Sequence, residues 1–325
     1  MYRMSRGRRL FRIAGLATMW PMPIRHRLLA GLVAVLWGLN FLAIHASLEH
    51  FPPFLCVALR WALLAVPTML FVPRPRVRAR WLIGYGVGFG ILQFVFLYWA
   101  MAIGMPTGLA SLVLQSSAPF TVILGAVLLR EHLSRTAMLG AAIAVGGLAI
   151  VGSQRFGGAT LWPFLLTVAG GLGWALGNLA SRQARPQNPL HLTLWMSVVP
   201  PLPMFALSWL VEGPDAVTSS LATALTPGAV PALLGLAYTC LVATVLAGGI
   251  WTWLMKAHPA SRVAPFSMLV PVVGLSTAWL VLGEVPNPVE ILGGVIVIGG
   301  VLYGSRGPRR PGELTPLDGE VVPAR

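Results

Sequence analysis

Two short segments of the chain each place a tryptophan and an asparagine on what would be one helical face. Residues 37–40 read Trp-Gly-Leu-Asn, and residues 174–178 read Trp-Ala-Leu-Gly-Asn. Side chains three or four residues apart lie on the same face of a helix. Both segments are embedded in apolar sequence, where an asparagine amide needs a polar partner and so faces protein or a cavity. We therefore predict that both pairs line a cavity for a small polar solute, with packing as the alternative role of the tryptophans.

Further amide and hydroxyl groups lie in two neighbouring apolar runs. Gln93 follows a glycine-rich stretch, and Ser111 and Gln115 are four residues apart, with Pro119 close behind. A proline inside a helix removes a hydrogen bond and favours a kink. A kinked helix lined by amides and hydroxyls suits a small polar substrate, although hydrogen bonding between helices is the alternative. The predicted substrate-binding set is Trp37, Asn40, Gln93, Ser111, Gln115, Trp174 and Asn178.

Arg60 is the one full charge well inside an apolar run. An arginine in the middle of a membrane helix costs roughly 2.5–3.5 kcal/mol on insertion scales, and less where it can reach the headgroups. Because Arg60 lies six residues after Phe54, snorkelling to the outer headgroups and structural anchoring are the favoured interpretation. Binding of a substrate carboxylate is the alternative.

The composition is that of a membrane protein. Of 325 residues, 56% are hydrophobic and 10% charged, whereas soluble domains have about 25% charged residues. A helix of roughly 20 apolar residues crosses the hydrocarbon core, and backbone polar groups in lipid must be paired within the segment. The sequence therefore predicts an all-α integral membrane protein with ten transmembrane helices. The predicted spans are 28–47, 54–72, 81–103, 107–129, 136–152, 160–180, 190–211, 229–255, 261–283 and 287–304.

The chain also contains an internal repeat. When residues 110–147 are aligned without gaps on 263–300, Glu131 falls on Glu284, and the paired glycines that end each segment coincide. Each copy, 28–152 and 160–304, holds five predicted spans. Because five is odd, the second copy must enter the membrane from the opposite side. Two inverted five-helix repeats are typical of secondary transporters, whose substrate site lies where the repeats meet.

The net charge of +14 is explained by position rather than by a nucleic-acid partner. Nearly all of the basic residues fall in the termini and the loops of one side, and the opposite side has only Arg155. Such asymmetry marks the cytoplasmic side. It predicts that both termini are cytoplasmic, including a basic extension at 1–27 (or a start at Met22) and a tail at 305–325; the family resemblance given below implies that the membrane is the bacterial inner membrane. Glu131 is expected to serve as a turn or ion-pair residue near Arg130 and Arg135, with a role in coupling as the alternative.

The sequence lacks the residue patterns that disulfide bonding, metal binding, phosphate binding or catalysis would need. Cys56 and Cys240 lie in apolar runs, where we expect them to pack, and neither a disulfide framework nor a metal site is predicted. The glycines between Gly84 and Gly90 have no preceding strand and no following Lys-Ser/Thr, so they favour close helix packing over a phosphate loop. Because no catalytic motif or carboxylate pair lies within the spans, we expect neither an enzyme nor a cofactor.

The repeated segments are similar to those of the EamA family of the drug/metabolite transporter superfamily, over about residues 29–304. Two stretches resemble its exporters of O-acetylserine, cysteine and related metabolites: 104–115, Gly-Met-Pro-Thr-Gly-Leu-Ala-Ser-Leu-Val-Leu-Gln, and 262–275, Arg-Val-Ala-Pro-Phe-Ser-Met-Leu-Val-Pro-Val-Val-Gly-Leu. The resemblance implies a ten-helix carrier that exports small amino-acid metabolites by alternating access, with a proton as candidate coupling ion. A broader drug and metabolite efflux carrier is the alternative.

Overall fold

The computed structural model describes residues 22–155 and 161–305, and every regular element within these ranges is a helix. The first half contains α2 (Ile24–Leu48), α3 (Pro53–Phe71), α4 (Ala79–Tyr85), η2 (Gly86–Leu92), α5 (Gln93–Ala102), α6 (Thr107–Val113), η3 (Leu114–Ser116), α7 (Ser117–Leu129) and α8 (Arg135–Ser153). The second half contains α9 (Leu161–Ala184), α10 (Pro189–Met196), α11 (Pro201–Val211), α12 (Pro214–Ala222), η4 (Pro227–Ala229), α13 (Val230–Ala237), η5 (Tyr238–Ala247), α14 (Gly248–Ala257), α15 (Ala260–Val263), η6 (Ala264–Met268), α16 (Leu269–Leu282) and α17 (Pro288–Gly304).

These elements confirm the predicted all-helical membrane fold. Within the described ranges, nine helical segments are long and apolar enough to cross a membrane, and α17 is a shorter apolar helix. The seventh predicted span is broken between α10 and α11, as its prolines indicate. The stretch 212–228, which lies between the predicted spans 190–211 and 229–255, contains α12 and η4 and is not a simple loop. Pro214 at the start of α12 explains this helix, because its fixed φ favours the first turn of a helix. The basic tails lie largely outside the described residues.

The two halves depart from α-helical geometry at corresponding spans, which is further evidence of the duplication. The third span of each half contains a π-helical stretch, η2 in the first and η5 in the second. The fourth span of each half contains a 3₁₀ stretch, η3 and η6. Pro119 accounts for η3, because it cannot donate a hydrogen bond to the carbonyl of Gln115 one turn earlier. Irregular helices at matching places in both halves mark the region where the halves meet.

Two glutamates related by the repeat lie at opposite ends of one span, which confirms that the halves are inverted. The carboxylate of Glu284 accepts hydrogen bonds from the backbone N–H groups of Thr107 (2.8 Å) and Gly108 (2.9 Å), at the start of α6. The span that begins there is 23 residues long and ends at Leu129, about 33 Å away at a rise of 1.5 Å per residue. Glu131 follows directly at that far end.

The environment of Glu131 differs from the prediction in its partner. Its Oε1 pairs with Arg182 at 2.5 Å, on a different helix, rather than with the neighbouring Arg130 or Arg135. Arg182 lies in the last turn of α9, so the pair connects the end of the fourth span to the end of the sixth. Both side chains are about half exposed.

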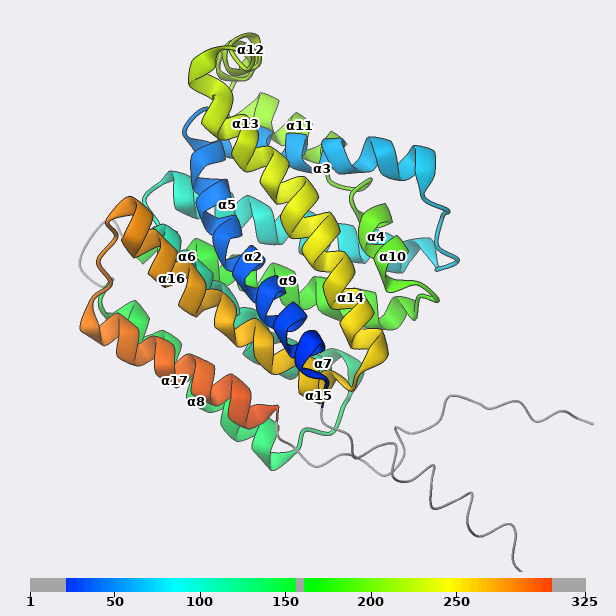
Figure 1. Cartoon of the computed structure of the whole chain (residues 1–325), viewed down its shortest axis with the longest axis vertical. Helices are drawn as coiled ribbons and strands as arrows, with labels where there is room; N and C mark the ends of the chain where they lie inside the picture. The colour runs from blue at the N-terminus through cyan, green and yellow to red at the C-terminus, as the bar shows by residue number, and fades with distance from the viewer. Residues whose placement is uncertain (1–21, 156–160, 306–325) are drawn as a thin grey trace, which may run out of the picture.

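The last helices of the two halves pack against each other. Figure 1 shows α8 and α17 side by side along one edge of the bundle, while α2 lies between α16 and α13. A methyl group on Gly147 would lie 2.7 Å from the carbonyl oxygen of Gly293, and one on Gly293 would lie 2.9 Å from that of Gly147. Backbone therefore packs on backbone at this contact. Gly146 and Gly299 have no atom within 4 Å of that position, so they do not contribute to the contact.

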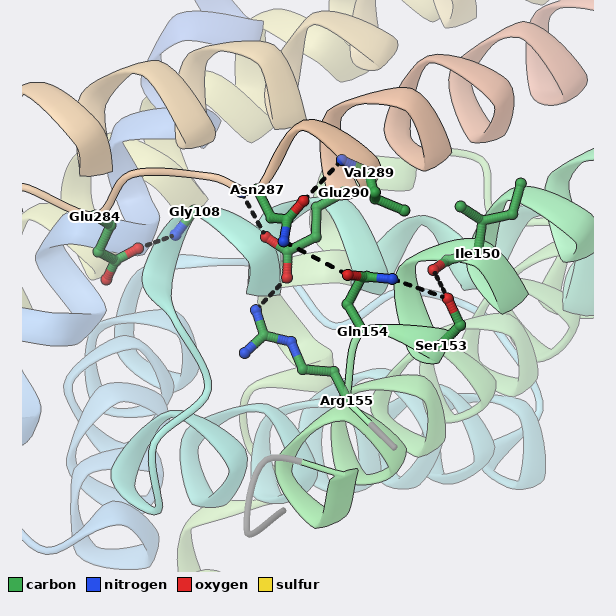
Figure 2. Close-up of polar contacts among 9 residues, drawn as sticks. All are labelled: Gly108, Ile150, Ser153, Gln154, Arg155, Glu284, Asn287, Val289 and Glu290. Carbon is green, nitrogen blue, oxygen red and sulfur yellow. Dashed lines mark hydrogen bonds and ion pairs between the residues drawn. The ribbon is translucent and has the colours of Figure 1, made fainter. Parts of the chain in front are cut away.

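Polar groups join these two helices on the side of Glu284 (Figure 2). Arg155, after the end of α8, forms an ion pair with Glu290 in the first turn of α17. Glu290 also accepts from the backbone N–H of Asn287 (3.1 Å), whose side chain caps the helix in return. From the distribution of basic residues among the loops, Arg155 is the one basic residue expected on this side of the membrane. Its pairing with Glu290 balances its charge.

We predict that Glu284→Ala destabilises the fold more than Glu131→Ala does. Glu284 caps the N-terminus of α6, and loss of such a cap costs about 1–2 kcal/mol. The half-exposed Glu131–Arg182 pair is expected to contribute less than about 1 kcal/mol. The measurement is the thermal unfolding midpoint of both purified variants in detergent. Equal midpoints would contradict the capping role of Glu284.

Candidate functional site

A cavity of about 570 Å³ lies between the two halves. It is lined from the first half by α2, α3 and the third and fourth spans, and from the second half by α9, α10, α14 and the irregular parts of the eighth and ninth spans. Its volume is in the range of small-molecule sites. All seven residues of the predicted set line it: Trp37, Asn40, Gln93, Ser111, Gln115, Trp174 and Asn178.

Glycines bring the sixth span close enough to the third to place three of these residues together. A methyl group on Gly88 would lie 2.5 Å from the backbone nitrogen of Gly177. One on Gly173 would lie 2.7 Å from the backbone nitrogen of Gln93. Because α9 can approach this closely, Trp174 and Asn178 lie at the same cavity as Gln93. Close packing of the third-span glycines, expected from the sequence, therefore shapes the site.

Trp37 and Trp174 pack against other side chains and also line the cavity. The indole N–H of Trp37 donates to the carbonyl oxygen of Ala243 at 2.9 Å, and its ring lies 5.1 Å from that of Trp251. Trp174 meets Phe89 edge to face, with 6.2 Å between ring centroids. Fixed in this way, the rings form aromatic walls that need no rearrangement to contact a solute.

The amides fall into two groups. The side-chain nitrogen of Asn178 donates to Thr121 Oγ1 at 3.3 Å, and that of Gln115 lies 3.8 Å from the sulfur of Met268. In contrast, Asn40 Oδ1 and Gln93 Oε1 are buried and accept no hydrogen bond from the described residues. A buried acceptor without a donor costs roughly 1–3 kcal/mol. These two oxygens are therefore acceptors that the described residues leave unsatisfied.

Ser111 differs from Asn40 and Gln93 because its polar group already has a hydrogen-bond partner. Its hydroxyl donates to the carbonyl oxygen of Gly108 within its own helix at 2.6 Å. A methyl group on Gly274 would lie 2.7 Å from the Ser111 Cβ, so α6 and α16 approach closely here. The hydroxyl proton of Ser111 is therefore already used within its own helix.

The expectation that Arg60 reaches the headgroups is wrong. Arg60 is 4% exposed and lines the cavity. Its guanidinium lies 4.0 Å from the ring centroid of Phe94 and 4.9 Å from that of Trp61. Its terminal nitrogens lie 3.3 Å from the Tyr98 hydroxyl and the Thr244 hydroxyl. These aromatic and hydroxyl groups replace the water and headgroups that snorkelling would have supplied.

Several lining residues were not predicted. Thr121, Thr193 and Thr252 supply hydroxyl groups, and Trp251 supplies a third indole. A single threonine or tryptophan in an apolar run carries no positional signal, because either packs equally well against lipid or protein. Cys56 and Cys240 are buried and unpaired. The Cys240 thiol lies 3.3 Å from the Arg60 carbonyl oxygen, where it fixes α3 against η5.

Comparison with known proteins agrees with this architecture. The model of the EamA-like transporter family matches residues 26–153 and 161–305, one match for each half. The chain is 40% identical over 84% of its length to a probable amino-acid metabolite efflux pump of Salmonella typhimurium, and 38% identical to one of Escherichia coli, covering 92% of each. It is 27% identical over 85% of its length to a probable terminal-alkyne amino-acid exporter of Streptantibioticus cattleyicolor, covering 91% of it. This family consists of transporters rather than enzymes. With both halves matched, the chain belongs to the EamA-like transporter family.

Proposed function

We propose that this transporter is a secondary active exporter of small amino-acid metabolites such as O-acetylserine and cysteine, working by alternating access. The observation that carries the proposal is the cavity between the inverted halves, with polar groups from both halves around it. A site at such a seam can be exposed to either side when one half rocks against the other. The names of the relatives from Salmonella and Escherichia support the same substrate class.

The lining suits a zwitterion with a short side chain. An ammonium group needs hydrogen-bond acceptors, and the buried oxygens of Asn40 and Gln93 are acceptors without donors. The faces of Trp37 and Trp174 would shield the hydrocarbon part and add a cation–π contact to the ammonium. Ser111, Gln115 and Asn178 would orient the remaining polar atoms.

The membrane location and the coupling are part of this proposal. The loop charges support a bacterial inner membrane with both termini cytoplasmic, so that Glu131 and Arg182 lie on the cytoplasmic side. Proton coupling rests on the family resemblance. Among the described residues that line the cavity there is no Asp, Glu or His, so a coupling proton would bind outside it.

Metabolite flux tests the proposal against broader drug efflux. Overproduction should lower cytoplasmic cysteine and O-acetylserine and raise both in the medium, measured by mass spectrometry of cells and supernatant. Gln115→Ala should cut this export while the amount of membrane-inserted protein stays normal. Unchanged metabolite pools together with faster efflux of a cationic dye would instead support the drug carrier.

A further inference from the structure

We propose that Arg60 binds the carboxylate of the substrate and thereby restricts transport to compounds with one free carboxylate. This inference rests on the proposed function and deepens it, because it names the chemical group that a substrate must carry. Arg60 is the only charged side chain among the described residues that line the cavity.

Among the described residues, no acid balances the charge of Arg60. The structure contains the ion pairs His45–Glu49, Arg155–Glu290 and Arg182–Glu131, and none of these includes Arg60. Glu212, which follows α11, places its carboxylate at the N-terminus of α3, the helix that contains Arg60. Its oxygens are already used there, because they accept from the backbone N–H groups of Phe54 (2.6 Å) and Leu55 (3.1 Å) and from the Ser208 hydroxyl. Buried charges in proteins are normally paired. The missing counter-charge is therefore expected to come from the substrate.

The hydrogen-bonding groups of Arg60 are only partly used. Its Nε has no partner among the described residues, and its bonds to Tyr98 and Thr244 are long at 3.3 Å. Charge-assisted bonds from a guanidinium are usually about 2.7–2.9 Å. Phe94 and Trp61 cover the flat guanidinium and leave its edge for hydrogen bonding. A planar edge with free donors is the geometry that binds a carboxylate through two parallel bonds.

The arrangement also selects against other solutes. With Arg60 supplying the positive pole, and Asn40 Oδ1 and Gln93 Oε1 supplying acceptors, the site complements both ends of a zwitterion. An amine without a carboxylate would leave Arg60 unpaired and would be repelled by it. A second carboxylate would have no cation to meet. The cavity therefore fits monocarboxylate amino acids and not cationic amphiphiles.

The test uses the full-length transporter in proteoliposomes preloaded with unlabelled cysteine, under reducing conditions. Uptake of labelled L-cysteine is measured against three competitors: O-acetylserine, cysteine methyl ester and cysteamine, the last two lacking a free carboxylate. O-acetylserine should compete, whereas the methyl ester and cysteamine should compete at least about tenfold more weakly, because they cannot form the charge-assisted hydrogen bonds between a carboxylate and Arg60.

Variants locate the effect at Arg60. Arg60→Gln should lower cysteine uptake at least about tenfold and remove the preference for cysteine over cysteamine, while Arg60→Lys should keep part of both. Arg182→Gln, which removes an exposed arginine outside the cavity, should leave the preference unchanged. Thermal unfolding midpoints check that the variants are folded.

Each outcome has a separate meaning. Equal competition by cysteamine and O-acetylserine in the wild type overturns the carboxylate role, even if Arg60 variants do not fold. A folded Arg60→Gln that keeps the preference overturns the assignment to Arg60, while export of cysteine still supports the proposed function. If the wild type transports neither cysteine nor O-acetylserine, the proposed function is wrong and this inference falls with it.

Discussion

Gly147→Leu is expected to prevent accumulation of folded transporter. The Cα of Gly147 faces backbone atoms of α17: a methyl group there would lie 2.7 Å from the Gly293 carbonyl oxygen and 2.8 Å from the Val297 nitrogen. Backbone cannot give way as a flexible side chain can, so the two helices must separate. Overpacking costs about 1–3 kcal/mol even where side chains can move. Here separation also strains the Arg155–Glu290 pair at the end of the same contact.

The neighbouring glycine supplies the control. Gly146 lies on the same helix with nothing within 4 Å of its added methyl position, so Gly146→Leu should accumulate normally. Both variants would be compared by fluorescence-detected size-exclusion chromatography of detergent extracts. A sharp, wild-type-like peak for Gly147→Leu would mean that α8 and α17 do not pack as described.

Gln93→Leu is expected to abolish most transport without loss of stability. Gln93 is 4% exposed, and its side-chain oxygen accepts no hydrogen bond from the described residues. Replacing an unsatisfied polar group with an apolar one of similar shape is neutral or stabilising. If that oxygen accepts from the substrate ammonium, its loss removes a bond to a charged group and lowers transport at least about tenfold.

Two measurements separate a binding role from a structural one. Labelled cysteine counterflow should fall in Gln93→Leu and in Asn40→Leu, while the unfolding midpoint stays at or above that of the wild type. Thr167→Val serves as the matched control, because Thr167 is fully buried in α9, outside the cavity, with its hydroxyl bonded within its own helix. Normal counterflow in both amide variants would remove the side-chain oxygens from the binding site.

Local sequence was sufficient to predict the membrane-spanning helices and the inversion of the two halves. Each span depends on a run of apolar residues that must satisfy its own backbone in lipid, so no long-range information is needed to predict it. The inversion follows from an odd number of spans per repeat, and the positions of Glu131 and Glu284 confirm it. The same reasoning predicted that Asn40, Gln93 and Asn178 face inward, because an amide in lipid needs a partner, and the structure places all three at one cavity.

Only the tertiary structure decided what each polar group meets. Arg60 contacts Tyr98 and Thr244, which are 38 and 184 residues away, and no local pattern distinguishes that environment from a path to the headgroups. Glu131 pairs with Arg182 across two helices although two arginines lie beside it in sequence. Gly146 and Gly147 are adjacent, but only Gly147 contacts α17. Such choices depend on how helices distant in sequence rotate and approach each other, and that geometry is fixed by packing of the whole bundle.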